Sequence, residues 1–471
     1  MKLTSGIKKY KRHKVLKILR NTSSEKFENT ALKKLLKSLR QSYKISPAYR
    51  DIINKRNIRI SDIKDLSEFK SKVPVLNKDN YFNQYSYSEL LGENCNKMKL
   101  AMSSSGFSGN FAFGFSSEKS LKSGQLGVDT TLDYWFDISN KKTFLINCAP
   151  MGVHVETSIP LAETSVRSDM ALSLLKKISP SYDQTIIAGD PHFLKKLIEE
   201  GDEQKINWKK LHVSLITAQD WLPESLRTYL ANRLGIDIDS NDDRGIFATM
   251  GMTELGLNVF HESKYSVAIR RTIIHDKKLR KLFLHSGMGF SPYFFHYYPF
   301  RTYIESIKTD DQEELLFSVT DKKSILPVLR YATGDSGKVF KYENFSKLLQ
   351  NSYPQFIPDL KLPVAIMSGR TKSRIQFANK FLSIEDIKEK LYLDYEFASS
   401  ITGLLMIKPL KNRLQLSIQL KDKVKKTSIL EGKISHIMYD HFPNEIEVKL
   451  LNYYEQLKGL ELNYEKKLSV I

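Results

Sequence analysis

Between residues 100 and 340, short apolar runs alternate with longer amphipathic stretches, and this alternation constrains the fold more than any other feature of the chain. Apolar, strand-like runs occur at 143–147, 185–188 and 213–217. The stretches between them have helical periodicity, as at 191–200 and 223–234. Strands that alternate with helices favour α/β units around a largely parallel sheet.

The part of the chain that follows Arg370 carries a different pattern. A helical stretch at 383–391 precedes strand-like runs at 404–407 and 414–419, and a second helical stretch covers 427–441. We therefore predict an α/β fold, with mixed, largely parallel sheets in a large N-terminal domain and a small, mobile α+β C-terminal domain. The expected divisions are a basic N-terminal segment at 1–45, the large domain at 46–368 and the small domain at 369–471.

Composition narrows the class of protein. Of the 471 residues, 41% are hydrophobic and 27% are charged, as in ordinary globular proteins. No apolar run approaches the roughly 18 residues that a membrane span requires, and the basic start lacks the apolar stretch of a secretory signal. Cys95 and Cys148 do not have the paired spacing of a zinc or redox site. We expect a cytoplasmic protein with no transmembrane segment.

The net charge of +20 is concentrated near the N-terminus. Residues 1–45 contain fourteen Lys or Arg against two Glu, a net +12. An amphipathic helix is expected over 30–42, ended by Ser46-Pro47, from the spacing of Leu32, Leu35, Leu36 and Leu39. This segment could make weak contact with an anionic membrane surface or an acidic carrier protein, and a solvated helix face is the simpler interpretation. It lacks the interleaved aromatic residues of a base-stacking surface, so no nucleic-acid partner is expected.

A loop of small residues precedes a strand-like alternation of phenylalanines at 111, 113 and 115. The loop contains Ser103, Ser104, Ser105, Gly106, Ser108 and Gly109. Glycine lets backbone N–H groups approach phosphate oxygens closely, and serine hydroxyls add hydrogen-bond donors. This is not the Walker pattern, because no Gly-Lys-Ser/Thr ends it and a strand follows. Alone, the loop predicts either a phosphate-binding segment or an ordinary Ser/Gly turn.

A second polar segment contains Gly251, Thr253 and Glu254 and follows the strand-like run 246–250. A carboxylate beside a hydroxyl at such a turn can hold Mg²⁺ close to phosphate groups.

Two more segments lie further along the chain. Strand-like residues 328–331 lead into a predicted Thr-Gly-Asp turn that ends in Asp335. An Asp at a strand end can bind two ribose hydroxyls, and an ordinary Gly-Asp turn is the alternative. Gly369 and Arg370 coincide with the predicted domain boundary, where a flexible junction suits a hinge.

These four segments, in this order and at this spacing, resemble the AMP-forming adenylate-forming superfamily, especially its phenylacetate–coenzyme A ligase-like branch. The resemblance extends over about residues 46–471. It implies an enzyme that uses ATP and Mg²⁺ to activate a carboxylic acid as acyl-AMP, and then transfers the acyl group to a thiol. The thiol would belong to coenzyme A or to carrier-protein phosphopantetheine. Aryl acids are the branch's commonest substrates, and medium fatty acids come next.

The resemblance also implies roles for individual residues. Glu254 would bind Mg²⁺, Thr253 would contact the α-phosphate or acyl carbonyl, Asp335 would bind ribose, and Arg370 would reach the nucleotide. The loop over the β- and γ-phosphates would consist of Ser104, Ser105, Gly106, Ser108 and Gly109. The adenine side of the site would contain Ala218, Gln219, Asp220, Met250 and Gly251.

A late lysine bridges the carboxylate and the α-phosphate in this superfamily. Lys467 is the expected residue and Lys466 the alternative. The physical reason is that an ammonium group lowers the repulsion between two approaching anions, while Mg²⁺ neutralises the leaving pyrophosphate. His154 and His261 are candidates for the acyl pocket, with structural histidines as the alternative interpretation.

The chain departs from the superfamily pattern at several positions. Phe107 replaces a Ser or Thr and Asn110 a Lys in the phosphate loop, and Met250 replaces the aromatic residue that stacks on adenine. These changes leave open a catalytically silent relative that acts as a binding or scaffold protein. Bacterial acyl-protein synthetases resemble the same branch, but they need a late cysteine, and no cysteine follows Cys148.

Overall fold

The computed structural model describes most of the chain: residues 2–103, 113–240, 242–284, 289–309, 313–370, 374–377, 380–410, 413–443, 445–455, 462–466 and 468–470. Several predicted site residues lie outside the described residues. They are Ser104, Ser105, Gly106, Phe107, Ser108, Gly109, Asn110 and Lys467.

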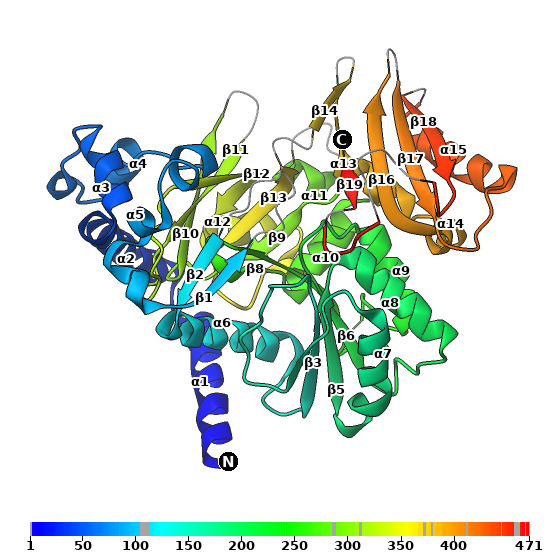
Figure 1. Cartoon of the computed structure of the whole chain (residues 1–471), viewed down its shortest axis with the longest axis horizontal. Helices are drawn as coiled ribbons and strands as arrows, with labels where there is room; N and C mark the ends of the chain where they lie inside the picture. The colour runs from blue at the N-terminus through cyan, green and yellow to red at the C-terminus, as the bar shows by residue number, and fades with distance from the viewer. Residues whose placement is uncertain are drawn as a thin grey trace.

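A large twisted sheet forms the centre of the molecule (Figure 1). Within the described residues it has eleven strands in the order β10-β11-β12-β13-β9-β8-β7-β6-β5-β3-β4. The half from β4 to β7 is parallel, and its crossover connections carry α7 (Ser168–Lys177), α8 (Pro191–Glu203) and α9 (Glu224–Leu234). The parallel strands are β3 (Thr143–Cys148), β4 (Leu161–Glu163), β5 (Gln184–Gly189), β6 (Val213–Thr217) and β7 (Ile246–Met252). The α/β alternation expected here is therefore confirmed.

The other half of the sheet is antiparallel, from β7 through to β10. Its strands are β8 (Gly256–His261), β9 (Tyr293–His296), β10 (Thr302–Lys308), β11 (Glu313–Val319), β12 (Tyr331–Phe340) and β13 (Val364–Arg370). The sheet is mixed, as predicted, but parallel pairing is confined to one half. The expected turn before Asp335 is wrong, because those residues lie inside β12, where a register shift next to Asp335 and a positive φ at Gly334 (81°) disturb the strand.

Two helices, α1 (Lys2–Asn21) and α2 (Ser24–Ile45), form the basic N-terminal segment. Ser46 ends α2, and its side chain caps α3 (Pro47–Asn54). The first turns of α1 project beyond the rest of the molecule (Figure 1). Further along, Arg12 donates hydrogen bonds to Ser139, and Leu19 is fully buried. Part of the basic segment is therefore attached to the large domain.

The remaining elements of the large domain are short. Between α3 and the central sheet lie η1 (Ile60–Asp62), α4 (Leu66–Lys72), η2 (Lys78–Phe82), α5 (Tyr87–Leu91), η3 (Gly92–Lys97), β1 (Met98–Ser103), β2 (Phe113–Ser117) and α6 (Glu118–Phe136). The later helical elements are η4 (Ser179–Ser181), α10 (Lys264–Ile273), α11 (Lys277–Phe283), α12 (Tyr342–Leu349) and η5 (Pro354–Phe356). Among the described helices, none combines the length and the apolar character that a membrane crossing requires.

The C-terminal part forms a separate sheet, which in its described residues has four strands in the order β18-β17-β16-β19. Its elements are the hairpin β14 (Arg374–Phe377) and β15 (Lys380–Ser383), then α13 (Ile384–Leu391), α14 (Tyr395–Ser400), β16 (Ile401–Pro409), β17 (Leu414–Leu420), α15 (Ser428–His441), β18 (Ile446–Leu451) and β19 (Ser469–Val470). The predicted α+β pattern is confirmed. Apolar residues of this part, such as Ile387 and Phe397, belong to the same buried cluster as Leu215 and Phe193 of the large domain.

Candidate active site

The turn between β7 and β8 holds Thr253 and Glu254. The Tyr331 hydroxyl of β12 donates a hydrogen bond of 3.3 Å to Glu254 Oε1. Burial raises the pKa of Glu254, and the nearby positive charges of Lys78 and Arg370 partly offset this. The protein thus compensates the charge of this carboxylate only in part. Such a carboxylate is suited to bind a metal cation or to accept hydrogen bonds from a ligand.

The segment that flanks the Ser/Gly loop lies directly against this turn. Strands β1 and β2 form an antiparallel hairpin on either side of residues 104–112. A Cβ atom on Gly114 would lie 1.7 Å from the Thr253 carbonyl oxygen, so only glycine permits this approach. Phe113 and Phe115 both contact the ring of Tyr87, with centroids 5.4 and 5.0 Å away. The two ends of the loop are thereby held beside Thr253.

Asp335 lies on β12, directly opposite Arg370 on β13. The Asp335 side chain is only 3% exposed, and it accepts a hydrogen bond from the Thr333 hydroxyl at 2.6 Å. Arg370 Nε lies 3.6 Å from Asp335 Oδ1, while the Arg370 side chain remains mostly exposed. Tyr331 and Asp335 share strand β12, and the charge of Arg370 acts on Glu254, so the three predicted residues lie in one region of the molecule.

The predicted adenine-side segment follows β6, where the backbone turns sharply. Gln219 has a φ of 78°, in the left-handed region that few residues other than glycine adopt. Among the described residues, neither polar atom of its side-chain amide has a hydrogen-bond partner, although both atoms are buried. Asp220 Oδ2 lies 2.7 Å from Lys388 Nζ of α13 and 3.6 Å from His192 Nε2. This segment therefore contacts the C-terminal part of the chain.

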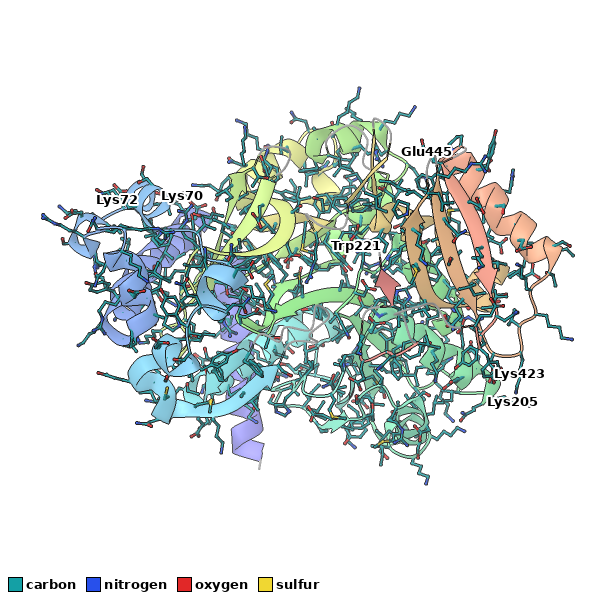
Figure 2. All side chains as sticks on the ribbon, turned by 45° about the horizontal axis from the view of Figure 1, so that its top comes forward. Lys70, Lys72, Lys205, Trp221, Lys423 and Glu445 are labelled. Atoms are coloured by element: carbon teal, nitrogen blue, oxygen red, sulfur yellow. The ribbon has the colours of Figure 1, made fainter. Side chains whose placement is uncertain are left out.

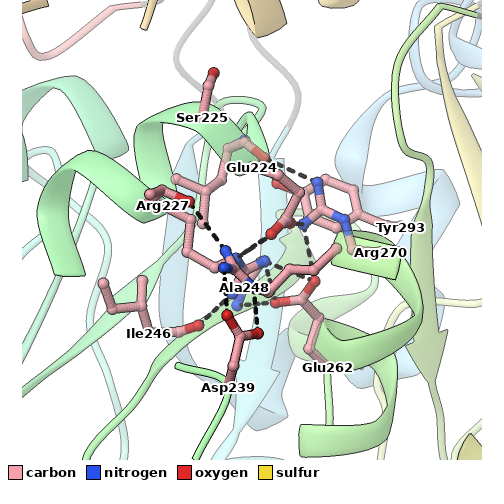
Figure 3. Close-up of polar contacts among 12 residues, drawn as sticks. Glu224, Ser225, Arg227, Asp239, Ile246, Ala248, Glu262, Arg270 and Tyr293 are labelled. Carbon is pink, nitrogen blue, oxygen red and sulfur yellow. Dashed lines mark hydrogen bonds and ion pairs between the residues drawn. The ribbon is translucent and has the colours of Figure 1, made fainter. Parts of the chain in front are cut away.

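A buried cluster of charged residues supports the chain just after Asp220 (Figure 3). Glu262 pairs with Arg227 at 2.9 Å and with Arg270 at 2.8 Å, and Glu224 contacts both arginines. Burial alone would raise the pKa of Glu262, but the two arginines outweigh it and hold that pKa low. Sequence reasoning missed this cluster, because no local pattern marks its members.

The same cluster extends to the backbone and to aromatic rings. Arg270 Nη2 donates a hydrogen bond to the Leu222 carbonyl at 2.9 Å. Its guanidinium also lies over the Tyr293 ring, 4.1 Å from the centroid, and over that of Trp221 at 5.8 Å. Figure 2 shows Trp221 between the large domain and the C-terminal sheet. These contacts hold Trp221 and Leu222 in place, and they thereby fix the C-terminal end of the segment that carries Gln219 and Asp220.

Three further predicted site residues are Met250, Gly251 and Lys466. Met250 and Gly251 lie on β7, and Met250 packs half-buried against the main core. Lys466 is exposed. Its neighbour Glu465 accepts a hydrogen bond from the Met151 amide at 2.7 Å and another from the Ser165 hydroxyl at 2.6 Å. The described residues 462–466, which include Lys466, therefore lie against the loop that follows β3.

A cleft of about 820 Å³, counted with its open mouth, begins at Thr253 and Glu254. It is lined on its other sides by β1, β2, α6 and the start of β10, and by His154, Glu156 and Asp321. His154 is held by Glu163, with Nδ1 2.8 Å from the carboxylate. His261 is instead buried in the core beside Tyr298, so its expected place in an acyl pocket is not supported. Arg301 also lines the cleft, and no sequence motif had indicated it.

Comparison with known proteins agrees at the level of the fold. No protein-family model and no curated protein sequence matches the chain. A 2-hydroxyisobutyryl-CoA ligase, solved in the postadenylation state with 2-HIB-AMP, is similar with a TM-score of 0.70 and 11% identity, over 96% of this chain and 91% of that one. The same ligase in the thioesterification state, with CoA as well, gives a TM-score of 0.55 and 11% identity over the same shares of the two chains, 96% and 91%. An anthranilate CoA ligase with anthranoyl-AMP gives 0.50 and 12% identity, over 86% of this chain and 74% of that one.

This chain therefore has the fold of the adenylate-forming CoA ligases. Its overall arrangement is closer to the postadenylation structure than to the thioesterification structure, since the TM-score falls from 0.70 to 0.55 between them. The phenylacetate–coenzyme A ligase-like branch remains a prediction.

Proposed function

We propose that this protein uses ATP to convert a carboxylic acid into an acyl-adenylate and then transfers the acyl group to a thiol. The observation that supports this most strongly is that Asp335 and Arg370 face each other on the adjoining strands β12 and β13, with Glu254 within reach of the charge of Arg370, in a fold found in acyl-CoA ligases. The sequence motifs predict that Glu254 binds Mg²⁺, that Asp335 binds the ribose and that Arg370 reaches the nucleotide. Their proximity is what a single nucleotide site would require.

The nucleotide would lie across the edge formed by these strands. Asp335 presents a buried carboxylate that can accept hydrogen bonds from two ribose hydroxyls, and Arg370 lies beside it to reach the nucleotide. The buried, unpartnered amide of Gln219 suits the adenine edge, because a donor and an acceptor on one side chain match those of adenine. The Ser/Gly loop, whose ends flank Thr253, would cover the β- and γ-phosphates.

A magnesium ion fits the donor groups at this site. The Glu254 carboxylate is half-buried and has a raised pKa, and no cluster of three or more His, Cys, Asp or Glu side chains occurs among the described residues. One protein carboxylate is typical of Mg²⁺ that is bound mainly through phosphates and water. When bound, Mg²⁺ would neutralise charge on the departing pyrophosphate.

The acid would enter the cleft beside Thr253, with its carboxylate directed at the α-phosphorus of ATP. The carboxylate oxygen would form a bond to phosphorus while the bond to pyrophosphate breaks, which gives acyl-AMP and pyrophosphate. Lys467, or Lys466 as the alternative, would lower the repulsion between the two anions. The contact of neighbouring Glu465 with Met151 supports this, because the same loop supplies His154 to the cleft.

In the second step a thiol would attack the acyl carbonyl, form the thioester and release AMP. Coenzyme A is the acceptor we favour, and carrier-protein phosphopantetheine is the alternative. We propose that a rotation of residues 369–471 about Gly369 and Arg370 admits the thiol. Such a rotation would have to break the Asp220–Lys388 pair and separate part of a shared apolar core.

The acid itself is proposed to be an aryl acid, with fatty acids as the next choice. The test is ATP–pyrophosphate exchange across a panel of both classes, comparing the wild-type protein with Glu254→Gln and with the surface control Glu118→Gln. Exchange that one acid class stimulates, and that only Glu254→Gln abolishes, is the expected result. Folded protein that binds ATP but exchanges with no acid would instead indicate the catalytically silent relative.

A further inference from the structure

Arg301 places a positive charge in the wall of the cleft that begins at Thr253, where the Asp321 carboxylate compensates it only in part. Among the described residues, its guanidinium makes one side-chain hydrogen bond, to the Ser123 carbonyl at 3.3 Å, and no ion pair within 4.0 Å. Burial lowers the pKa of Arg301, and the Asp321 carboxylate offsets this only in part. A guanidinium has five N–H donors, so most of its capacity is available to a ligand.

The helix beside Arg301 is shaped to admit this side chain. A Cβ atom on Gly127 would lie 2.3 Å from Arg301 Nη1, while one on Gly124 would lie 3.9 Å from Nη2. Both glycines are inside α6, where each one lowers helix stability by about 1 kcal/mol relative to alanine. At Gly127 the missing side chain leaves the space that the guanidinium occupies.

The guanidinium lines the same cleft as Thr253 and lies against α6. Helix α6 begins at Glu118, directly after β2, and β2 is the strand whose Gly114 touches Thr253. With a rise of 1.5 Å per residue, Gly124 lies roughly 10 Å along the helix from its start. An acid that places its reacting carboxylate at Thr253 would extend into a cleft whose wall also carries Arg301.

We propose that the acid carries a second anionic group, most simply a second carboxylate, and that Arg301 binds it. This inference rests on the proposed adenylation function. A carboxylate matches the planar fork of a guanidinium with two parallel hydrogen bonds. Binding in this way would complete the compensation of a charge that Asp321 offsets only in part, whereas a simple fatty acid would leave most of the guanidinium donors unused. Arg301 would thus select among acids without taking part in the chemistry.

The test compares pairs of acids that match in length and differ in the second carboxylate: hexanoate with adipate, octanoate with suberate, and 4-methylbenzoate with terephthalate. The selectivity of ATP–pyrophosphate exchange, taken as the ratio of kcat/KM for the diacid to that for the monoacid, is measured for the wild-type protein and Arg301→Gln. We expect the ratio to favour the diacid in the wild-type protein and to fall by about 10- to 100-fold in the variant, through KM. An unchanged ratio would overturn the proposal.

Two helix variants separate binding from folding. Gly127→Ala should stabilise α6, but its methyl group should displace the guanidinium and lower the diacid selectivity. Gly124→Ala should stabilise α6 to a similar extent without displacing the guanidinium, because its methyl group would lie 3.9 Å from Nη2. Equal selectivity in these two variants would contradict the proposed contact.

Calorimetric binding of the same acid pairs distinguishes this proposal from the proposed function. A diacid that binds the wild-type protein more tightly than its monoacid, with the difference lost in Arg301→Gln, would support the Arg301 site even if no exchange occurred. Absence of any diacid preference in the wild-type protein would overturn it. An Arg301→Gln defect confined to the thiol step, with exchange selectivity intact, would assign Arg301 to a phosphate of the thiol acceptor and would also overturn it.

Discussion

Lys388 of α13 donates a hydrogen bond of 2.7 Å to the carboxylate of Asp220 at the end of β6, and both side chains are almost fully buried. Asp220 also accepts a hydrogen bond from the Trp221 amide. The pair joins the predicted adenine-side segment to the C-terminal part of the chain. A change in either residue should therefore affect stability and the nucleotide site together.

We expect Lys388→Met to lower the free energy of unfolding by about 3 kcal/mol, because it leaves a buried carboxylate without its main partner. Asp220→Asn combined with Lys388→Met should recover much of this loss, since no unpaired charge then remains. Chemical denaturation of the two single variants and the double variant measures the coupling. Strictly additive losses would show that the two side chains do not stabilise one another.

Glu254→Gln should abolish ATP–pyrophosphate exchange and leave the protein as stable as the wild type or more so. Burial raises the pKa of Glu254 in the folded state, so keeping it ionised at pH 7 disfavours folding. This contribution is destabilising above the unfolded pKa and vanishes as the pH falls. Thermal unfolding at pH 7 checks the prediction, and a marked fall in Tm would mean that the carboxylate has a structural role instead.

Asp335→Asn should raise the KM for ATP by about 10- to 100-fold, because a neutral amide binds ribose hydroxyls more weakly than a carboxylate does. The maximal rate should change less, since the ribose is remote from the reacting phosphorus. Asp239→Asn, at an exposed carboxylate paired with Arg271, is the matched control. A KM for ATP that stays at the wild-type value would remove Asp335 from the nucleotide site.

Lys467→Ala should reduce the adenylation rate by about 100-fold or more while ATP still binds, because the ammonium acts on charge that develops in the transition state. Lys466→Ala should have a smaller effect. Lys70→Ala serves as a control, since Lys70 lies at the opposite end of the molecule from the C-terminal sheet (Figure 2). If Lys466→Ala gives the larger loss of pyrophosphate exchange, the alternative assignment holds.

Two buried histidines, His261 and His296, should make the protein sensitive to mild acid. Burial lowers the pKa of His296 to about 4 and that of His261 well below its usual value. The unfolded chain then binds more protons, so stability is lost as the pH falls from about 6.5 to 4, by about 3 kcal/mol for His296. Urea denaturation across this range should show a shallower pH dependence for His296→Gln. The exposed His436→Gln should keep the wild-type slope.

The sequence predicted the helices and strands that are determined by local patterns of residues. Helix α8 begins at Pro191, as its pattern indicated, and β6 spans Val213–Thr217 as expected. The predicted turn before Asp335 was wrong. Gly334 is typical of a turn, but it lies in β12, a strand whose register is set by pairing with β13. Local patterns carry little information about partners that are distant along the chain.

The same distinction applies to the site. Glu254, Asp335 and Arg370 lie in short motifs, so their chemistry could be inferred before their positions were known. Residues that support the site could not be found in this way: Arg227 and Glu262 are 35 positions apart, and Asp220 and Lys388 are 168 apart. Arg301 was missed because its significance depends on the space beside Gly127, which no motif records.

Helix α9 has no side-chain cap from its own N-cap residue, Pro223. The Glu389 carboxylate accepts hydrogen bonds from the backbone amides of Glu224 and Ser225 instead, at 3.0 and 2.8 Å. Glu389 is 165 positions further along than Glu224. During synthesis, α9 would therefore leave the ribosome long before its cap, and its first turn should become protected only when α13 has emerged and docked.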